Sequence, residues 1–398
     1  MNKILITGDI LKPDPKKISS NQRDNIIWFY NLIYPFIRYN TESVDVEIIL
    51  SEQFNPQKFY SFFKKDVSVE NWAALYDCES LPENANDYLK TYFSEYLLIV
   101  GYELPTIFIK YFEANDIKFI NCFLSPIRFL NDLLFSAYSN INNFDNIFNI
   151  YKVTNEEIFL YSGLHTATIK RQNKHQTIVS NSCLIIGQTE IDRSVIRNGE
   201  FDSLKNHISE ITELCLKYNK VYFKPHPYSK KGNELTYDFK KLDIEIINDN
   251  VYHLLANDNI IEVVALSSSV LYEAKYFYKK IKYLIPENDK FDLPISNDFF
   301  SYSFWHNVLS NCVPTVNEIP KGRITHRENL LRNSLNMYWG YNELSPKILF
   351  DNLANQVELK IEKKYKISYS YKIGNALLSP IVLLIKFMKK FYKIFTQH

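Results

Sequence analysis

Short apolar runs alternate with amphipathic segments along most of this sequence, and the alternation is its main structural signal. Residues 4–6 form the first apolar run and predict a strand that turns at Gly8. Residues 21–39 have helical spacing and predict a helix that ends or kinks near Pro35. Further strands are predicted at residues 42–50, 96–100 and 117–124, and a mostly helical stretch is predicted at residues 66–96, with a break at Leu81 and Pro82.

A second series of apolar runs follows a polar stretch. Residues 149–162 have a weak strand pattern, and residues 168–181 read as a linker or exposed loop. Strands are then predicted at residues 182–186, 221–223, 244–246, 260–264 and 281–284, with helices between them. Strands that alternate with helices are typical of parallel α/β folds. The pattern predicts an α/β domain at residues 1–165, a second at 166–335, and C-terminal helices at 336–398.

The stretch KVYFKPHP, residues 220–227, is the strongest candidate for chemistry. It predicts a buried strand that ends at two prolines and delivers Lys224 and His226 to its carboxyl end. Ligands bind at that edge in open α/β sheets. Pro225 and Pro227 fix the backbone on both sides of His226, and a His beside a Lys suits an anion such as phosphate. The plainer alternative is a strand end with a surface histidine.

A second stretch has the same organisation. Ser267, Ser268 and Ser269 follow the strand predicted at residues 260–264, and a helical pattern begins at Val270. Hydroxyls and free backbone N–H groups at such a junction can bind an anion. One of the serines can simply be the helix N-cap, but a cap needs only one.

These motifs carry a family resemblance. A strand ending in KPHP, followed about forty residues later by a strand ending in SSS, resembles the HP and SS motifs of bacterial transferases that use CMP-activated acidic sugars. CLIIGQTEIDRS, residues 183–194, and FLSPIRFLNDLLFSAYSN, residues 123–140, resemble the retaining β-Kdo transferases of capsule and O-antigen assembly. The resemblance spans residues 100–276. It implies a GT-B fold, two Rossmann-like α/β domains with the active site in the cleft between them, and a CMP sugar as donor.

The resemblance also suggests roles for individual side chains. Asp192, with Glu190 as the second choice, is the expected carboxylate nucleophile of a retaining transfer. Glu103 is the candidate acid or base, and a solvated acidic loop is the plain alternative for the pair at 190 and 192. The expected substrate-binding residues are Arg128, Asp132, Gln188, Lys224, Ser267, Ser268 and Ser269. Arg128 or Lys224 would hold the sugar carboxylate, and His226 and Lys224 would offset phosphate charge.

Composition and charge exclude several other classes. The chain has 398 residues and a net charge of +1, which argues against nucleic acid as a partner. Five cysteines without a CxxC pair argue against a disulfide framework or a zinc ribbon. Neither a dinucleotide fingerprint nor a P-loop is present, and the histidines lack paired ligand spacing, so no metal or other cofactor is expected. The short first apolar run is not typical of a signal peptide, and a cytoplasmic protein is expected.

The C-terminal end has a pattern of its own. Residues 360–398 contain nine lysines and one glutamate. At 100° per residue, apolar side chains of residues 383–395 share one face and lysines share the opposite face. This pattern predicts an interfacial helix on anionic inner-leaflet lipid, so the protein would be peripheral on the inner face of the bacterial inner membrane. A helix that packs back on the protein is the alternative.

The sequence therefore predicts a transferase that moves Kdo from CMP-Kdo to a glycan or lipid-linked glycan acceptor with retention. Three alternatives stay open. An inverting sialyl- or nonulosonic acid transferase would share the HP and SS motifs. A CDP-glycerol glycerophosphotransferase has an HP-like motif, and a non-catalytic partner in polysaccharide assembly would bind CMP weakly or not at all.

Overall fold

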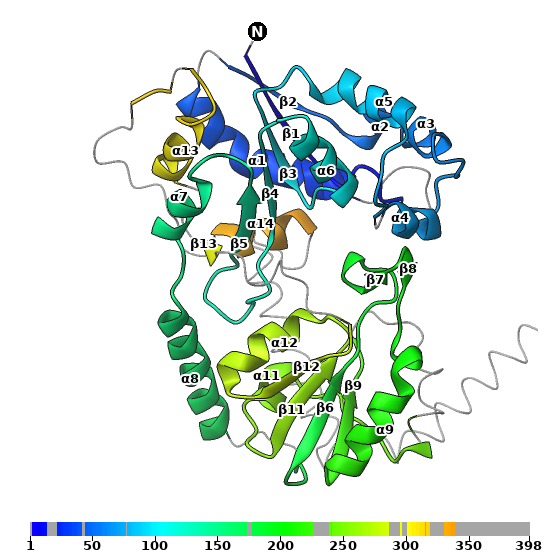
Figure 1. Ribbon diagram of the computed structural model, residues 1–398. Helices are drawn as coiled ribbons and strands as arrows, with labels where there is room; N and C mark the ends of the chain where they lie inside the picture. Colours follow the sequence, from blue (N-terminus) through cyan, green and yellow to red (C-terminus); the bar gives the residue numbers. More distant parts are fainter. Residues whose placement is uncertain are drawn as a thin grey trace, which may run out of the picture. The chain divides into compact units, whose positions relative to one another are not determined.

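The protein forms two compact units, Met1–Arg332 and Asn333–His398, and the first contains both of its large β-sheets (Figure 1). The computed structural model describes residues 2–13, 22–41, 44–76, 78–172, 177–226, 239, 241–285, 295–296, 301–314, 316–318 and 330–339. Both sheets lie in one unit, and the division expected at residue 165 falls inside a helix, α8 (Asn155–Gln172).

The first sheet has the order β13-β5-β4-β3-β1-β2. Its parallel strands are β2 (Asp45–Ile48), β1 (Lys3–Gly8), β3 (Leu98–Tyr102) and β4 (Phe119–Leu124). Two antiparallel strands complete one edge, β5 (Phe135–Ser139) and β13 (Ile295–Ser296). The parallel strands β1, β3 and β4 are almost wholly buried, as expected for strands covered by helices on both faces.

Helices connect the strands of the first sheet. They are α1 (Arg23–Asn40), α2 (Ser51–Phe54), α3 (Pro56–Ser61), α4 (Val69–Tyr76), α5 (Glu83–Phe93) and α6 (Thr106–Ala114). The break predicted at Leu81 and Pro82 is confirmed, because α4 and α5 lie on either side of it. The helix predicted at residues 21–39 is confirmed as α1. It does not end near Pro35 but runs through the proline to Asn40, and Ile33 and Ile37 are buried on either side of it.

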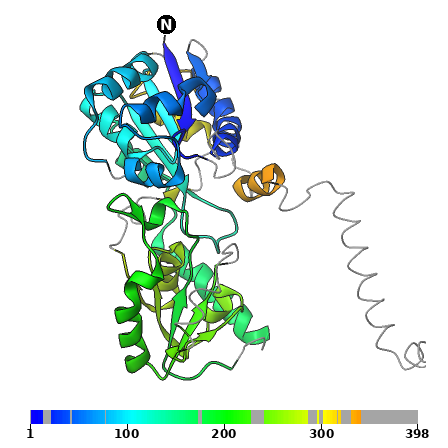
Figure 2. The same cartoon turned by 90° about the vertical axis from the view of Figure 1, so that its right-hand side faces the viewer.

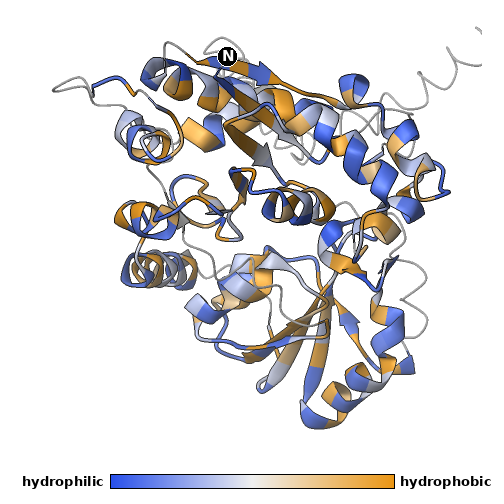
Figure 3. Cartoon of the chain, turned by 45° about the horizontal axis from the view of Figure 1, so that its top comes forward, coloured by the Kyte–Doolittle hydropathy of each residue, from blue (hydrophilic) through white to orange (hydrophobic). Residues whose placement is uncertain are grey.

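The second sheet is fully parallel, with the order β10-β9-β6-β11-β12. Its strands are β6 (Ser182–Ile186), β9 (Lys220–Lys224), β10 (Glu245–Ile246), β11 (Ile260–Ala265) and β12 (Lys280–Tyr283). All five lie where the apolar runs predicted strands. The described helices of this half include α9 (Ile208–Lys217), α11 (Val251–Leu255) and α12 (Ser269–Ala274). Hydrophobic residues are concentrated on the central strands (Figure 3).

A small hairpin interrupts the second half between β6 and α9. It consists of the 3₁₀ turn η1 (Arg193–Val195), β7 (Ile196–Arg197) and β8 (Glu200–Phe201), and a second 3₁₀ turn, η2 (Leu204–His207), follows it. Asn198 and Gly199 both have positive φ, the backbone that a two-residue hairpin turn requires. Phe201 packs 6.0 Å from Trp72 on α4, so the hairpin contacts the first half of the unit.

Residues 149–162 are not a strand, and the segment expected as a linker is partly helical. Helix α7 (Phe144–Ile150) precedes α8, which extends to Gln172. The weak strand pattern is instead part of a helix, α8, on which Leu160 and Leu164 stay exposed. Exposed apolar positions weaken the helical pattern and explain the wrong prediction.

The chain returns to the first sheet after completing the second. Strand β13 pairs antiparallel with β5, and α13 (Tyr302–Leu309) packs against α1 (Figures 1 and 2). Phe304 and Trp305 of α13 are fully buried there. The sequence pattern predicted that this segment belongs to the second domain, and that prediction is wrong. A two-residue strand that pairs with a distant edge has no local signal in the sequence. The last described helix, α14, spans Leu330–Trp339.

The loop of residues 125–134, which connects β4 to β5, joins the two halves through apolar packing. Its residues Ile127, Phe129, Leu130 and Leu134 are buried in the same cluster as side chains of the second sheet and its helices. The Phe129 ring lies 5.3 Å from that of Phe277 and 6.1 Å from that of Tyr252. We call residues 125–134 the connecting loop.

No helix in the described part of the chain is both long enough and apolar enough to span a bilayer. The C-terminal stretch for which an interfacial helix is predicted, residues 360–398, lies outside the described residues.

Phe129→Ala should destabilise the protein by about 3–5 kcal/mol, because it empties an aromatic site shared by both halves. Urea unfolding followed by tryptophan fluorescence would measure the change. Leu216→Ala on α9, where Leu216 is 85% exposed, is the control and should change stability by less than about 0.5 kcal/mol. Equal effects of both substitutions would contradict a joining role for the connecting loop.

Candidate functional site

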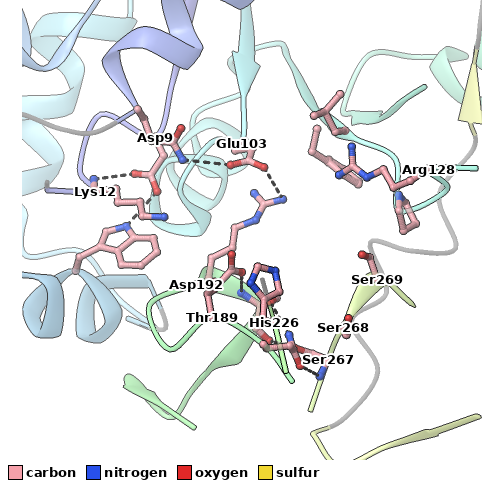
Figure 4. A pocket seen from close by; sticks show the side chains of 18 residues that line it. Asp9, Lys12, Glu103, Arg128, Thr189, Asp192, His226, Ser267, Ser268 and Ser269 are labelled. Carbon is pink, nitrogen blue, oxygen red and sulfur yellow. Dashed lines mark hydrogen bonds and ion pairs between the residues drawn. The ribbon is translucent and has the colours of Figure 1, made fainter. Parts of the chain in front are cut away.

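A cavity of about 230 Å³ lies where strand ends of both sheets meet. Its walls follow the carboxyl ends of β1, β3 and β4 in the first sheet and of β6, β9 and β11 in the second, the edge at which α/β proteins bind ligands. It is lined by Asp9, Lys12, Gln22, Trp72, Glu103, Phe123, Leu124, Pro126, Arg128, Gln188, Thr189, Asp192, Arg193, Ser194, His226, Ser267, Ser268 and Ser269 (Figure 4). Eight of the eleven residues predicted from sequence are therefore on one cavity, and Glu190, Lys224 and Asp132 are not.

Gly187 brings the ends of β6 and β9 together beneath His226. Its backbone N–H donates to the Lys224 carbonyl at 2.8 Å, and a Cβ at this position would lie 3.0 Å from the backbone nitrogen of His226. Burial lowers the pKa of His226, Asp192 opposes this shift, and Lys224 adds to it. The imidazole is therefore neutral near pH 7 and able to donate one hydrogen bond.

Gln188 and Ser267 hold the ends of β6 and β11 to each other. Gln188 Oε1 accepts from the Ser267 backbone N–H at 2.7 Å, and Gln188 Nε2 donates to Ser267 Oγ at 3.2 Å. Ser267 is 2% exposed and its hydroxyl also donates to the Ser194 carbonyl. Both side chains therefore shape the wall of the cavity, and their predicted contact with substrate stays a prediction.

The other two serines are more open to the cavity. Ser268 is the N-cap of α12, and its hydroxyl accepts from the Val270 N–H at 3.4 Å, which confirms that one of the three serines is a cap. Ser269 is the first residue of α12 and is partly exposed. These hydroxyls lie on the same cavity wall as His226.

The two carboxylates of the TEID segment have different environments. Asp192 is half-buried, lines the cavity, and accepts from the Ser194 backbone N–H at 2.8 Å as the cap of η1. Glu190 is exposed and is not one of the lining residues. The turn between them separates the side chains, which the spacing of two residues left open.

Glu103 follows β3 of the first sheet and lines the same cavity as Asp192. Its backbone is left-handed (φ 56°), which is uncommon outside glycine. Its carboxylate accepts from Gln22 Nε2 at 3.3 Å and pairs with Arg193 Nη2 at 3.5 Å. Burial lowers the pKa of Arg193, but Glu103 and other neighbours outweigh burial and raise it overall. Arg193 Nη1 is buried and has no hydrogen-bond acceptor among the described residues.

Asp9, Trp72 and Lys12 form a part of the wall that sequence reasoning missed. Asp9 directly follows β1, is 2% exposed, and accepts from Trp72 Nε1 at 3.0 Å and from the Leu11 and Lys12 N–H groups at 3.2 and 3.1 Å. Burial raises its pKa to about 6, although Lys12 and these hydrogen bonds oppose the shift. Lys12 Nζ lies 4.7 Å from the centre of the Trp72 ring. The aspartate after the first strand was the available signal.

The connecting loop places Arg128 on the cavity from the side of the first sheet. The Arg128 N–H donates to Glu273 Oε1 at 2.7 Å, and its carbonyl accepts from Arg332 Nη2 at 2.9 Å. Its main chain is thus fixed on both sides while the guanidinium lines the cavity.

Asp132 and Lys224, which the sequence predicted to bind substrate, do not line the cavity. The Asp132 carboxylate accepts from the N–H groups of Leu331 and Arg332 at 3.2 and 2.8 Å, so it caps the start of α14. Lys224 is half-buried at the end of β9, where burial lowers its pKa and Asp249 opposes the shift. Lys224 is therefore at the strand end that the sequence predicted, but it is not one of the residues that line the cavity.

No cluster of three or more metal-ligating side chains occurs among the residues that the structure describes. The expectation that catalysis needs no metal stays a prediction.

The comparisons with known proteins match one family model to part of the chain and leave the donor open. Residues 156–285, about a third of the chain, match the family model described as alpha-2,8-polysialyltransferase. No curated protein matches. Solved structures with similarity include the β-Kdo 2,7 transferase of Thermosulfurimonas dismutans KpsC, at 13% identity and a TM-score of 0.37, covering 70% of this chain and 77% of that one.

Two other similar structures have comparable values. The β-Kdo 2,4 transferase of the same KpsC has 12% identity and a TM-score of 0.34, with 70% and 78% coverage of this chain and that chain. The UDP-GlcNAc 2-epimerase of Neisseria meningitidis has 14% identity and a TM-score of 0.29, with 71% and 82% coverage. The two α/β halves, with a cavity lined by both, confirm the expected GT-B-like architecture. The family match, which includes both the HP and SS motifs, supports a glycosyltransferase.

Proposed function

We propose that this protein is a glycosyltransferase of bacterial surface polysaccharide assembly that moves Kdo, or a related acidic sugar, from its CMP-activated form to a glycan acceptor with retention. The observation that carries the proposal is one cavity that combines anion-binding hydroxyls and a histidine with a partly buried carboxylate and an arginine from the opposite half. A CMP-activated ulosonic acid has two anionic groups, a phosphate and a carboxylate, and this cavity offers a partner for each.

The phosphate would bind at Ser268, Ser269 and His226. Hydroxyls and a neutral imidazole are good hydrogen-bond donors to a phosphate oxygen. His226 is held above Gly187 on the stiff backbone that Pro225 provides, so little side-chain freedom is lost on binding. The donor's nucleotide would therefore bind to the second half of the unit.

The sugar carboxylate would bind Arg128. A guanidinium binds a carboxylate through two parallel hydrogen bonds, and the main chain of Arg128 is already fixed by Glu273 and Arg332. In this arrangement the carboxylate and the phosphate on the anomeric carbon are held from opposite halves, which orients the bond that breaks.

Retention would proceed in two displacements. The Asp192 carboxylate attacks the anomeric carbon, the bond from that carbon to the phosphate oxygen breaks, and CMP leaves with the electron pair. The acceptor hydroxyl then attacks the same carbon, the bond to Asp192 breaks, and the hydroxyl proton passes to a base. Glu103 is the proposed base, since its side chain lines the cavity and is held there by its pairing with Arg193.

A second candidate function is an inverting transferase for sialic acid. The match of residues 156–285 to the polysialyltransferase model favours it. The same cavity groups would bind CMP-sialic acid, but no sugar would become attached to Asp192. Transfer from CDP-glycerol, or no turnover at all, are the other outcomes that remain to be distinguished.

The C-terminal stretch would hold the protein at the cytoplasmic face of the inner membrane, near a lipid-linked glycan acceptor. This proposal rests on the sequence pattern alone, in which lysines share one face of residues 383–395 and apolar side chains share the other.

The nucleotide site predicts a thermal shift that depends on His226. CMP should raise the melting temperature of the wild type but scarcely that of His226→Ala, because a hydrogen bond to the phosphate, worth about 1.5–3 kcal/mol, is lost. Differential scanning fluorimetry with CMP measures both. His253→Ala, a histidine on α11 outside the cavity lining, is the matched control. The same shift in all three proteins would remove His226 from the site.

The mechanism predicts a covalent sugar adduct. Mixing the wild type with CMP-Kdo should add the mass of one Kdo to the intact protein, and peptide mapping should locate it on residues 184–197. Asp192→Ala should lose the adduct while still binding CMP, and Glu190→Ala should keep it. A product of inverted configuration, or full activity of Asp192→Ala, would contradict the mechanism and favour the sialyltransferase.

The membrane proposal predicts that deletion of residues 380–398 releases the protein from anionic liposomes and leaves turnover of soluble substrates mostly intact. Flotation of the full chain should also weaken as salt is raised, because exposed lysine charges are screened over about 8 Å at physiological ionic strength. An insoluble truncated chain would show instead that the stretch is part of the folded protein.

A further inference from the structure

Glu273 is a buried carboxylate that lies behind the cavity wall and does not itself line it. It is on α12, four residues after Ser269, and is 2% exposed. Burying a carboxylate is costly unless hydrogen bonds compensate for the water that it loses. This position therefore needs an explanation beyond packing, because an apolar residue would fill the same space without that cost.

Glu273 accepts hydrogen bonds from the connecting loop and from Tyr252, a residue that packs against this loop. Oε1 accepts from the Arg128 backbone N–H at 2.7 Å and from the Tyr252 hydroxyl at 3.0 Å. The Tyr252 ring packs 6.1 Å from that of Phe129, the next residue of the loop. The carboxylate thus bonds the second half of the unit to the residue of the first half that presents a guanidinium to the cavity.

Arg332 holds the other side of the Arg128 main chain. Its Nη2 donates to the carbonyls of Arg128 and Leu130 at 2.9 and 3.1 Å. Asp132 in turn fixes Arg332 by accepting from its backbone N–H at 2.8 Å. The main chain of Arg128 is therefore clamped between a carboxylate on α12 and a guanidinium at the start of α14.

We infer that Glu273 is a positioning residue that holds Arg128 at the height where its guanidinium meets the carboxylate of the donor sugar. The inference rests on the proposed function of the cavity. Since α12 begins at the proposed phosphate-binding serines, a single short helix would connect phosphate binding at its first residue with carboxylate binding through its fifth. Glu273 would then determine selectivity for acidic sugars without touching CMP.

The ionisation of Glu273 has a cost in protein stability. Burial raises its pKa to about 7, and the hydrogen bonds from Arg128 and Tyr252 oppose this shift. The groups that face it are Arg128 on the connecting loop and Tyr252 on α11; Arg332 on α14 and His165 on α8 lie next to Tyr252 and Phe129. Because the folded pKa is above that of the unfolded chain, Glu273 lowers the stability progressively as pH rises from the unfolded pKa to about 7, and by a constant amount above that. A residue kept in spite of this cost is consistent with a positioning role.

The test measures two affinities by calorimetry, one for CMP and one for CMP-Kdo, with CMP-N-acetylneuraminate as a second acidic sugar. In Arg128→Gln and in Glu273→Ala, affinity for the CMP sugars should fall about tenfold while affinity for CMP changes less than twofold. Glu273→Gln keeps an acceptor oxygen and should retain most of the selectivity. The double variant should lose no more than Arg128→Gln alone, since both changes remove one interaction.

Glu262 provides a matched control. It is also a buried glutamate of the second half, 7% exposed on β11, and it accepts from the Tyr218 hydroxyl at 2.6 Å, but it is not on the cavity. Glu262→Ala should lower the melting temperature and leave the ratio of the two affinities unchanged. If Glu273→Ala behaves like Glu262→Ala, Glu273 is structural and the inference is wrong.

Two further outcomes separate this inference from the proposed function. If Arg128→Gln leaves the ratio unchanged, or the wild type binds CMP sugars no better than CMP, the proposed carboxylate site is wrong. If Glu273→Ala does not fold, Glu273→Leu and Glu273→Gln decide: Glu273→Leu fills the same space without an acceptor oxygen and should lose the selectivity, whereas Glu273→Gln should retain most of it. The same affinity ratio in both variants would overturn the inference.

Discussion

The insertion of the connecting loop into the second half of the unit is the constraint on which the rest of the structure depends. Ile127 and Phe129 are buried among side chains of α11 and α12, so the edge of the first sheet is fixed against the second. Apolar packing alone has no directional preference. The hydrogen bond from the Arg128 N–H to Glu273 fixes the position of the loop relative to α12. The cavity exists because strand ends of the two sheets are held at this distance.

Acidic and basic side chains both line the cavity, and the two halves contribute different sets of them. The second half contributes Asp192 and His226 together with hydroxyls, whereas the first contributes Glu103 with Arg128 and Lys12. The Arg193–Glu103 pair crosses from one half to the other at 3.5 Å, with Arg193 stacked 5.8 Å from the Phe123 ring. Carboxylates and cations from both halves suit a substrate that carries anionic groups on its reacting carbon and an acceptor that must lose a proton.

The sequence predicted the parallel strands and the second-sheet part of the site because both depend on local patterns. Buried runs bounded by polar or turn residues identified all five strands of the second sheet, and the residues that follow them include His226 and Ser268. The rest depended on contacts between distant residues. Asp9 meets Trp72 across 63 positions, and Arg128 meets Glu273 across 145. The Asn198–Gly199 hairpin had a clear local signal that was not used, whereas the return of Ile295–Ser296 to the first sheet had none.

Donor-dependent release of CMP is the direct test of whether this cavity transfers an acidic sugar from a CMP donor. The full chain would be incubated with CMP-Kdo, CMP-N-acetylneuraminate or CDP-glycerol, each with and without a lipid extract from a polysaccharide-producing bacterium, and free CMP would be quantified by chromatography. The account predicts CMP release from an acidic CMP sugar that rises when acceptor is added and is abolished by His226→Ala. Release from CDP-glycerol alone, or from none of the three donors, would contradict it.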